Sequence, residues 1–204
     1  MPSEIVGLPR LFGIQPPPFR LDGKTVVLRT PDRRDWLQWA QLREASRDFL
    51  TPWEPSWSAD ALTRTAFRRR LTHYATDWRT DQGYSFLLFR LADDALLGGI
   101  GISNVRRGVA ETGSLGYWIG APYARQGSMT EGLQLTLAFA FQRVRLHRLE
   151  AACLPHNLPS RRLLLKSGFR EEGQAREYLC IDGRWQDHVL FGLLRQEWEA
   201  QGRR

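Results

Sequence analysis

The stretch from residue 113 to residue 144 constrains the fold more than any other part of the chain, because a strand, a glycine turn and a helix follow one another there. Leu115, Tyr117 and Ile119 alternate with smaller residues, which predicts a strand that ends before Pro122. A helix is predicted next, and its apolar residues recur at helical spacing: Leu133, Leu137, Phe141 and Val144. A chain with this order favours a layered α/β fold.

Gly127 lies in the turn between this predicted strand and helix. A glycine lets the backbone come close to a ligand. The free amides at the start of a helix, together with the helix dipole, attract an anion, and phosphate is the usual one. An ordinary strand-to-helix connection without a ligand has the same pattern, so both interpretations remain open for this stretch taken alone.

The size and composition of the chain favour one globular domain. It has 204 residues, of which 42% are hydrophobic and 25% charged, and this length allows a sizeable core. No window is apolar enough to cross a bilayer and no signal pattern opens the chain, so we expect no membrane partner. Cys153 and Cys180 lie far apart, which predicts no disulfide framework and favours a cytoplasmic location.

The chain has a net charge of +7 and an isoelectric point near 10.1. This excess favours acidic partners such as nucleic acid, a ribonucleoprotein or a polyphosphorylated cofactor. An arginine-rich proteome would produce the same excess without any such partner. Charge alone therefore leaves the partner open.

The remaining patterns predict one mixed α/β domain over residues 24–200, preceded by an arm at 1–23 that contains three prolines and no periodic pattern. Strands are expected at 24–30, 84–90, 96–104, 148–154, around 169–181 and 186–194. Helices are expected after Pro31-Asp32, after a cap at Asp60, and from a cap at Asn157 through Ser167. Asp182-Gly183 predicts the turn of a final hairpin.

Three segments allow a structural and a functional interpretation. The Pro- and Trp-rich segment 49–57 places Glu54 either at a substrate pocket or in solvent or at a helix cap, with its tryptophans in the core. The helix after Asp60 carries a basic stripe that is either a solvated face or an RNA contact, formed by Arg64, Arg68, Arg69 and Arg70. Glycines at 98, 99 and 101 predict a bulge or a close backbone approach.

Several short motifs are similar to one known family. The run Pro-His-Asn-Leu-Pro-Ser at 155–160, Gly168-Phe169 and the central stretch together resemble the GCN5-related N-acetyltransferase (GNAT) superfamily. The block Phe-Leu-Thr-Pro-Trp-Glu-Pro at 49–55, the block Tyr-Leu-Cys-Ile-Asp-Gly-Arg-Trp-Gln-Asp-His-Val-Leu at 178–190 and residues 103–108 resemble its RimJ-type ribosomal-protein-alanine N-acetyltransferases. The resemblance covers the chain from Lys24 to the C-terminus.

The resemblance implies the GNAT fold, a twisted, mostly antiparallel mixed sheet flanked by helices, in which two splayed strands form the acetyl-coenzyme A cleft. These strands would be 115–119 and 149–154, and the pantetheine arm would pair with their free backbone groups. The pyrophosphate would bind the amides of 125–130, at the anion site derived above. The implied cofactor-binding residues are Tyr117, Trp118, Ile119, Arg125, Gln126, Gly127, Ser128, Met129, Thr130, Asn157 and Ser160.

Two positions in the turn depart from the family pattern. Ala124 stands where the family usually has Arg or Gln, and Met129 stands where it has Gly or Ala. Backbone amides make the contact, so the loss of the first side chain is tolerable, and Arg125 and Gln126 offer replacement donors. Met129 leaves the tightness of the turn open, and Thr130 offers a hydroxyl to the phosphate.

The same resemblance implies an acid and a base. Many relatives have a tyrosine acid seven residues after the Asn of this motif, but Leu164 occupies that position here. Ser160 is then the implied acid for the leaving thiolate, and Glu177, which precedes a Tyr-Leu pair, is the implied base. Glu54 is the second candidate base. A carboxylate near the amine would accept its proton, and the backbone N–H of Ile119 or a neighbour would stabilise the tetrahedral intermediate.

Other chemistry-bearing residues favour structural interpretations. No covalent acetyl-enzyme is needed, and Cys153 is expected to be a small buried apolar residue. His188 is expected to be a core histidine that ties a hairpin together. The four histidines and two cysteines show no ligand spacing, so no metal is expected.

Three hypotheses follow for the function. The first is transfer of acetyl from acetyl-coenzyme A to a protein N-terminal amine through a ternary complex, with the N-terminal alanine of a ribosomal protein as the leading substrate. The second is acetylation of a small amine such as an antibiotic or amino-acid derivative. The third is a non-catalytic ribosome- or RNA-binding module, supported by the basic surface. The presence of Gly127, Asn157, Ser160 and Glu177 together favours catalysis.

Overall fold

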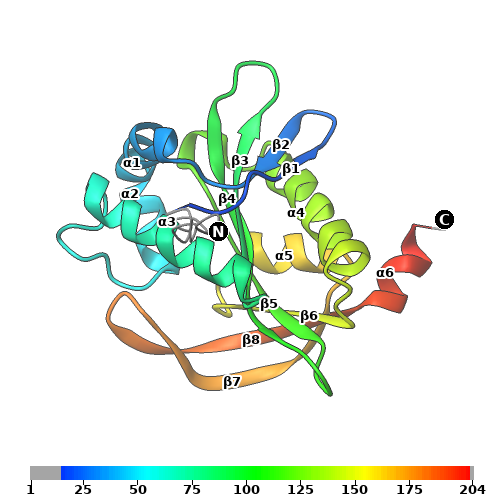
Figure 1. Cartoon of the computed structure of the whole chain (residues 1–204). Coiled ribbons are helices and arrows are strands. Elements are labelled where there is room, and N and C mark those ends of the chain that lie inside the picture. The colour runs from blue at the N-terminus through cyan, green and yellow to red at the C-terminus, as the bar shows by residue number, and fades with distance from the viewer. Residues whose placement is uncertain (1–14, 203–204) are drawn as a thin grey trace, which may run out of the picture.

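An eight-stranded sheet runs through residues 15–202, the part of the chain that the computed structural model describes (Figure 1). Its strand order is β1-β2-β3-β4-β5-β6-β8-β7, and every neighbouring pair is antiparallel except β5 and β6, which are parallel. The strands are β1 Arg20–Asp22, β2 Val26–Arg29, β3 Tyr84–Arg90, β4 Leu96–Arg106, β5 Thr112–Ile119, β6 Arg148–Cys153, β7 Arg170–Ile181 and β8 Arg184–Leu194. The mixed, mostly antiparallel sheet expected from the sequence is confirmed.

Helices cover both faces of this sheet (Figure 1). They are α1 Trp36–Ala45, α2 Arg47–Leu50, α3 Arg64–Arg79, α4 Ser128–Ala138, α5 Leu158–Lys166 and α6 Arg195–Gln201. Short 3₁₀ turns lie at η1 Arg33–Asp35, η2 Thr51–Trp53 and η3 Ala121–Tyr123, and a π-helical turn at η4 Phe139–Arg143. Helices α1 and α3 pack on one face of the sheet, and α4 packs on the other. The sheet therefore has two separate surfaces on which a ligand can bind.

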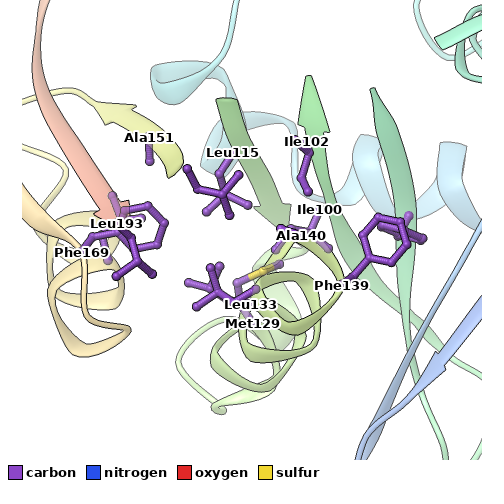
Figure 2. Close-up of a cluster of buried hydrophobic side chains, with 14 of the residues drawn as sticks. Ile100, Ile102, Leu115, Met129, Leu133, Phe139, Ala140, Ala151, Phe169 and Leu193 are labelled. Carbon is purple, nitrogen blue, oxygen red and sulfur yellow. The ribbon is translucent and has the colours of Figure 1, made fainter. Parts of the chain in front are cut away.

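The face beneath α4 holds the larger core. Met129 and Leu133 of α4 pack against Ile100, Ile102 and Leu115 of β4 and β5 (Figure 2). Leu137, Phe141 and Val144 are also buried, so the apolar helical face expected from the sequence is confirmed. The helix widens into the π-turn η4 before it ends, which the spacing of apolar residues did not predict.

Local capping explains where two helices begin. Asp32 caps η1, just before α1, in a capping box with Asp35, as its position after Pro31 predicted. Asp60 does not cap α3. The side chain of Thr63 accepts the amide of Ala66, and Asp60 instead forms an ion pair with Arg69. Both Asp60 and Thr63 are good cap residues, and the position of the chain as it approaches α3 decides between them.

The described part of the expected N-terminal arm, residues 15–23, includes a strand that the sequence did not reveal. β1 pairs with β2 in the register Arg20↔Arg29, and Phe19 packs against the rings of Trp78 and Phe139. Thr30 donates its hydroxyl to the carbonyl of Pro17 and ties this segment down. Residues 1–14 of the arm lie outside the described part.

The last two strands form a long hairpin along one edge of the sheet (Figure 1). Its turn is Asp182-Gly183, with φ of 45° and 75°, so the hairpin turn expected from this dipeptide is confirmed. β8 begins at Arg184, two residues before the expected start. His188 is buried in this hairpin and its Nδ1 lies 2.9 Å from the carbonyl oxygen of Gln186, as expected for a core histidine.

Candidate active site

The sheet opens where β5 and β6 separate. Their parallel pairing runs from Thr112↔Arg148 to Leu115↔Ala151 and stops there. Beyond this point β5 continues against β4 as far as Ile119, whereas β6 continues against β8 as far as Cys153. The facing edges of the two strands are left without a strand partner, and an extended ligand arm can pair with such edges. The splayed pair expected from the family resemblance is therefore present at the expected strands.

The turn before α4 exposes a run of backbone amides. Gly127 caps the helix with φ of 84°, and Arg125 has φ of 63°, so two left-handed residues curl the backbone around the helix start. Within this turn, Glu131 is the first residue whose amide donates to the backbone, to the Gly127 carbonyl at 3.1 Å. The amides of 125–130 thus have no backbone partner among the described residues, and their role as an anion site stays a prediction.

The side chains of this turn do not crowd the amides. Gln126 donates to the carbonyl of Pro122 at 2.8 Å, so its side chain braces the turn. Met129 departs from the family pattern of this turn, but its side chain lies in the core beneath α4 (Figure 2). The side chain therefore does not fill the turn. Arg125 is exposed, and Ser128 and Thr130 are half-buried at the helix start. Gln126 and Met129 therefore offer a ligand only their amides.

Glu131, the acidic residue in the first turn of α4, forms hydrogen bonds with another segment of the chain. Glu131 accepts the amides of Lys24 and Thr25 and the Thr25 hydroxyl, which donates at 2.6 Å. Burial acts to raise the pKa of this carboxyl, but the hydrogen bonds from Thr25 and Lys24 outweigh it and lower the pKa. The carboxylate thus links the turn between β1 and β2 to α4. Its hydrogen bonds with this turn engage it away from the proposed anion site.

A pair of hydroxyl groups lies at the point of separation. The amide of Ser160 donates to Asn157 Oδ1 at 3.1 Å, which caps α5 as expected from the sequence. The Ser160 Oγ lies 2.8 Å from the hydroxyl oxygen of Tyr117 on β5. Burial raises the pKa of Tyr117, so this phenol keeps its proton over the physiological range. Cys153, at the end of β6, is buried as expected, and burial raises the pKa of its thiol.

Sequence reasoning missed the contact between Tyr117 and Ser160. Leu164, at the position where many relatives have a tyrosine, is buried in the core and cannot donate a proton. Tyr117 instead supplies a phenol from β5. The alternation along β5 places Tyr117 and Ile119 on the sheet face that α4 covers. This alternation was the one feature of the sequence that could have predicted the position of Tyr117.

A cleft of about 800 Å³ lies on the opposite face of the sheet, between the strands and α1 and α3. Its lining includes Gly99, Gly101 and Gly116, and the register pairs Gly101 of β4 with Gly116 of β5. A Cβ at Gly99 would lie 2.5 Å from Nε1 of Trp118, so a larger residue would displace that indole. β4 also carries the expected irregularity, because its register with β3 shifts between Leu88 and Phe89, next to Gly98. The glycines thus mark both a bulge and a close approach.

Glu54 lies in this cleft with both carboxylate oxygens engaged. Arg43 donates to both oxygens, and Trp57 Nε1 donates to Oε2 at 2.9 Å. The Arg43 guanidinium carbon lies 4.3 Å from the centre of the Trp57 ring and 4.9 Å from that of Trp118. Glu54 therefore occupies the pocket position that one interpretation expected, held in an ion pair with aromatic walls.

Glu177 lies in a different place. It sits with φ of 46° in the irregular part of the hairpin between Ala175 and Leu179, where its amide donates to Asp187 Oδ1 at 2.9 Å. Its side chain is exposed and makes no hydrogen bond or ion pair with any described residue. It is not part of the cleft lining. The hairpin nevertheless reaches the cleft, because the amide of Asp182 donates to the Glu54 carbonyl at 3.0 Å.

The basic stripe of α3 divides between two surfaces. Arg69, Arg70 and His73 line the cleft, whereas Arg64 and Arg68 do not. This division could not be seen from the sequence, because it depends on how α3 is rotated over the sheet. Within residues 15–202, no cluster of three or more His, Cys, Asp or Glu side chains could hold a metal ion. The described helices include none that is long and apolar enough to cross a membrane.

Known proteins that resemble this chain are N-acetyltransferases. The family model described as the acetyltransferase (GNAT) domain matches residues 25–170. The chain is 34% identical over 177 residues to a probable N-acetyltransferase, YjcK, of Bacillus subtilis, covering 87% of this chain and 98% of that protein. It is also 34% identical over 182 residues to the [ribosomal protein uS5]-alanine N-acetyltransferase of Escherichia coli, covering 89% of this chain and 94% of that one.

A solved structure adds a ligand to the comparison. The structure of Mycobacterium smegmatis RimJ in complex with CoA-disulfide superposes with a TM-score of 0.79 at 31% identity, covering 92% of this chain and 94% of that one. The likeness therefore extends over nearly the whole of both chains.

Proposed function

Because this chain belongs to the acetyltransferase (GNAT) family, an acetyl-coenzyme A-dependent class of enzymes, we propose that it acetylates the N-terminal α-amine of a protein. The leading acceptor is a ribosomal protein with an N-terminal alanine, which is the substrate class in the name of the E. coli relative. The observation that carries the proposal is the 800 Å³ cleft across the sheet from the anion-binding turn. A cleft of this size receives the first residues of a chain.

The donor side uses the features on the α4 face. The free strand edge of β5 beyond Leu115 would pair with the pantetheine arm, and the amides of 125–130 would bind the pyrophosphate. The side chain of Trp118 contributes to the cleft instead, since it packs beside Gly99 and Arg43. Donor and acceptor thus approach the reacting atoms from opposite faces of the sheet, which suits a ternary complex.

Direct attack then accounts for the reaction. The deprotonated amine attacks the thioester carbon, and a backbone N–H of Ile119 or its neighbour stabilises the oxyanion. The C–S bond breaks as the intermediate collapses, and the electron pair goes to the sulfur. Ser160, supported by the Tyr117 hydroxyl 2.8 Å away, passes a proton to this thiolate and regains one from solvent, while the nitrogen of the intermediate loses its extra proton to the base. The amide product and coenzyme A then leave.

Glu177 is the proposed base, and Glu54 is the proposed organiser of the cleft. A general base needs a free oxygen to accept the proton of the amine. The Glu177 carboxylate has no partner among the described residues, whereas both oxygens of Glu54 are engaged by Arg43 and Trp57. Glu177 is not part of the cleft lining, so the proposed proton transfer from the amine to its carboxylate would pass through water.

The test is thiol release from acetyl-coenzyme A with peptides that begin with Ala or Ser and with a panel of small amines. We expect peptide turnover. Glu177→Gln should lower kcat by about 10²–10⁴-fold without lowering the melting temperature, because the side chain has no partner among residues 15–202. Glu54→Gln should lower the melting temperature by leaving Arg43 poorly paired. Turnover of small amines alone would replace the proposed acceptor, and full activity of Glu177→Gln would remove it as the base.

A further inference from the structure

We infer that the cleft selects acceptor segments that carry an acidic side chain a few residues after the N-terminal amine. This inference rests on the function proposed above and specifies its substrate class. The observation behind it is the sign of the charge that lines the cleft on the α1 and α3 face.

The ionisable acidic and basic side chains that line the cleft are Arg43, Glu54, Arg69, Arg70 and His73. Glu54 is the single acid among them, and Arg43 neutralises it. The remaining ionisable groups are Arg69, Arg70 and His73. The His73 Nε2 lies 3.2 Å from Oδ2 of Asp77, a carboxylate outside the cleft lining, so the arginines provide the positive charge of the cleft. A cleft lined by one sign of charge attracts ligands of the opposite sign.

Arg69 and Arg70 differ in whether a carboxylate already neutralises their charge. Arg69 forms an ion pair with Asp60, which lies outside the cleft lining. Arg70 has no carboxylate partner among the described residues. Its hydrogen-bond partner is the hydroxyl of Tyr74, at 3.4 Å. Arg70 is therefore the cation whose charge remains available to an acceptor.

Arg70 is exposed like Arg68, but it has a ring contact that supports its guanidinium. Its guanidinium carbon lies 5.3 Å from the centre of the Trp39 ring, and Trp39 is buried against Phe67. A guanidinium supported by an aromatic face loses less conformational freedom when it binds a carboxylate, and its planar fork suits bidentate contact. Arg70 is thus both unneutralised and preorganised.

The geometry limits where along the acceptor the acid would lie. The reaction takes place beside β5, at the separation from β6, whereas α3 packs over β3, two strands away. Two strand spacings are about 10 Å, which an extended chain spans in about three residues. The acid is therefore expected at about the third or fourth position of the acceptor.

The experiment compares three peptides of one length that begin with alanine and differ at the fourth position, which carries Glu, Gln or Lys. We expect KM to rise about tenfold from Glu to Gln and further to Lys, with kcat unchanged. Arg70→Gln should abolish the difference between the Glu and Gln peptides. Arg68→Gln is the matched control, because Arg68 is an exposed arginine on the same helix outside the cleft lining.

The outcomes separate this inference from the function on which it rests. Equal KM for the three peptides, with efficient turnover, would overturn the charge selection and leave N-terminal acetylation intact. A preference for the Glu peptide that survives Arg70→Gln, or that disappears in Arg68→Gln, would overturn the role of Arg70. Absence of turnover with every peptide would overturn both the proposed function and this inference.

Discussion

Gly116 is the glycine of the cleft lining where a side chain would have the most room. Its Cβ would meet no atom within 4 Å, in contrast to Gly99 and Gly101, where it would crowd an indole or a carbonyl. The position lies just beyond the last pair between β5 and β6, and it lines the cleft. The absence of a side chain here keeps the cleft open beside the proposed reaction centre without being required by the fold.

We therefore expect Gly116→Val to raise KM for an N-terminal peptide by about tenfold or more, because the new side chain occupies acceptor space. Gly116→Ala should have a smaller effect. Coenzyme A affinity, measured by calorimetry, should stay near the wild-type value because the substitution projects into the acceptor cleft. Unchanged peptide KM in both variants would show that the acceptor does not cross this position.

The hydroxyl pair leads to a second prediction at the residue scale. Ser160→Ala removes the group proposed to protonate the thiolate, so kcat should fall by about 10²-fold with little change in peptide KM. Ser167→Ala is a suitable control, since Ser167 lies at the other end of α5 and its buried hydroxyl has no hydrogen-bond partner among the described residues. Stopped-flow or steady-state thiol release measures both. A wild-type kcat in Ser160→Ala would assign the proton to another donor.

Tyr84 should make stability sensitive to high pH. Burial, followed by a hydrogen bond to Asp81, raises its pKa to about 12 from an unperturbed value near 10. A group with a raised folded-state pKa stabilises fully below the unfolded pKa, and the stabilisation is lost as pH rises through the folded pKa. The urea midpoint of the wild type should therefore fall between about pH 10 and pH 12, and that of Tyr84→Phe should fall less. Parallel falls in the two proteins would contradict this assignment.

At the scale of elements, the start of α4 depends on a left-handed cap. Gly127 has φ of 84°, and nothing lies within 4 Å of its Cβ position, so the backbone conformation and not the available space requires glycine. The same conformation presents the amides of 125–130 to a ligand. The helix start and the proposed anion site are therefore one structural feature.

Gly127→Ala should lower the free energy of unfolding by about 1–2 kcal/mol, because an L side chain is disfavoured at positive φ. It should also weaken coenzyme A binding by shifting the amides. Thermal melting with and without coenzyme A measures both effects. Gly116→Ala is the comparison, since it adds the same methyl group at a position without a positive φ. Equal effects of the two substitutions would show that backbone conformation is not the cause.

At the scale of the whole molecule, the sheet consists of two parts joined by a short parallel ladder. β1 to β5 form one part and β6 to β8 the other, and four residue pairs connect β5 to β6. A ligand that fills the opening would pair with edges of both parts. The donor should therefore act as a stabilising strand in the middle of the sheet.

Hydrogen exchange tests this role. Saturating coenzyme A should slow exchange of backbone amides in β5 beyond Leu115, as well as at 125–130, because these groups gain hydrogen-bond partners. At a concentration 100 times Kd, the free energy of unfolding should rise by about 2.7 kcal/mol. Protection confined to 125–130 would mean that the arm does not pair with the strand edge. In Gly127→Ala at a limiting concentration of coenzyme A, the amides of β5 beyond Leu115 and those of 125–130 should lose their protection from exchange together.

The sequence by itself determined the features that depend on neighbouring residues. The strand of 115–119, the glycine turn at 127, the cap at Asn157 and the hairpin turn at Asp182-Gly183 all follow from local backbone preferences. Short motifs in the same regions also pointed to the family. These predictions succeeded because backbone conformation and capping depend on a few consecutive residues.

Only the tertiary structure decided which distant groups meet. Tyr117 and Ser160 are 43 residues apart and form a pair because the folded chain brings the start of α5 to β5. Arg43 neutralises Glu54, Thr63 replaces Asp60 as a cap, and Arg70 faces the cleft while Arg68 does not. Such contacts depend on strand order, helix rotation and the path of loops, all of which are set by packing of the whole core and not by any local pattern.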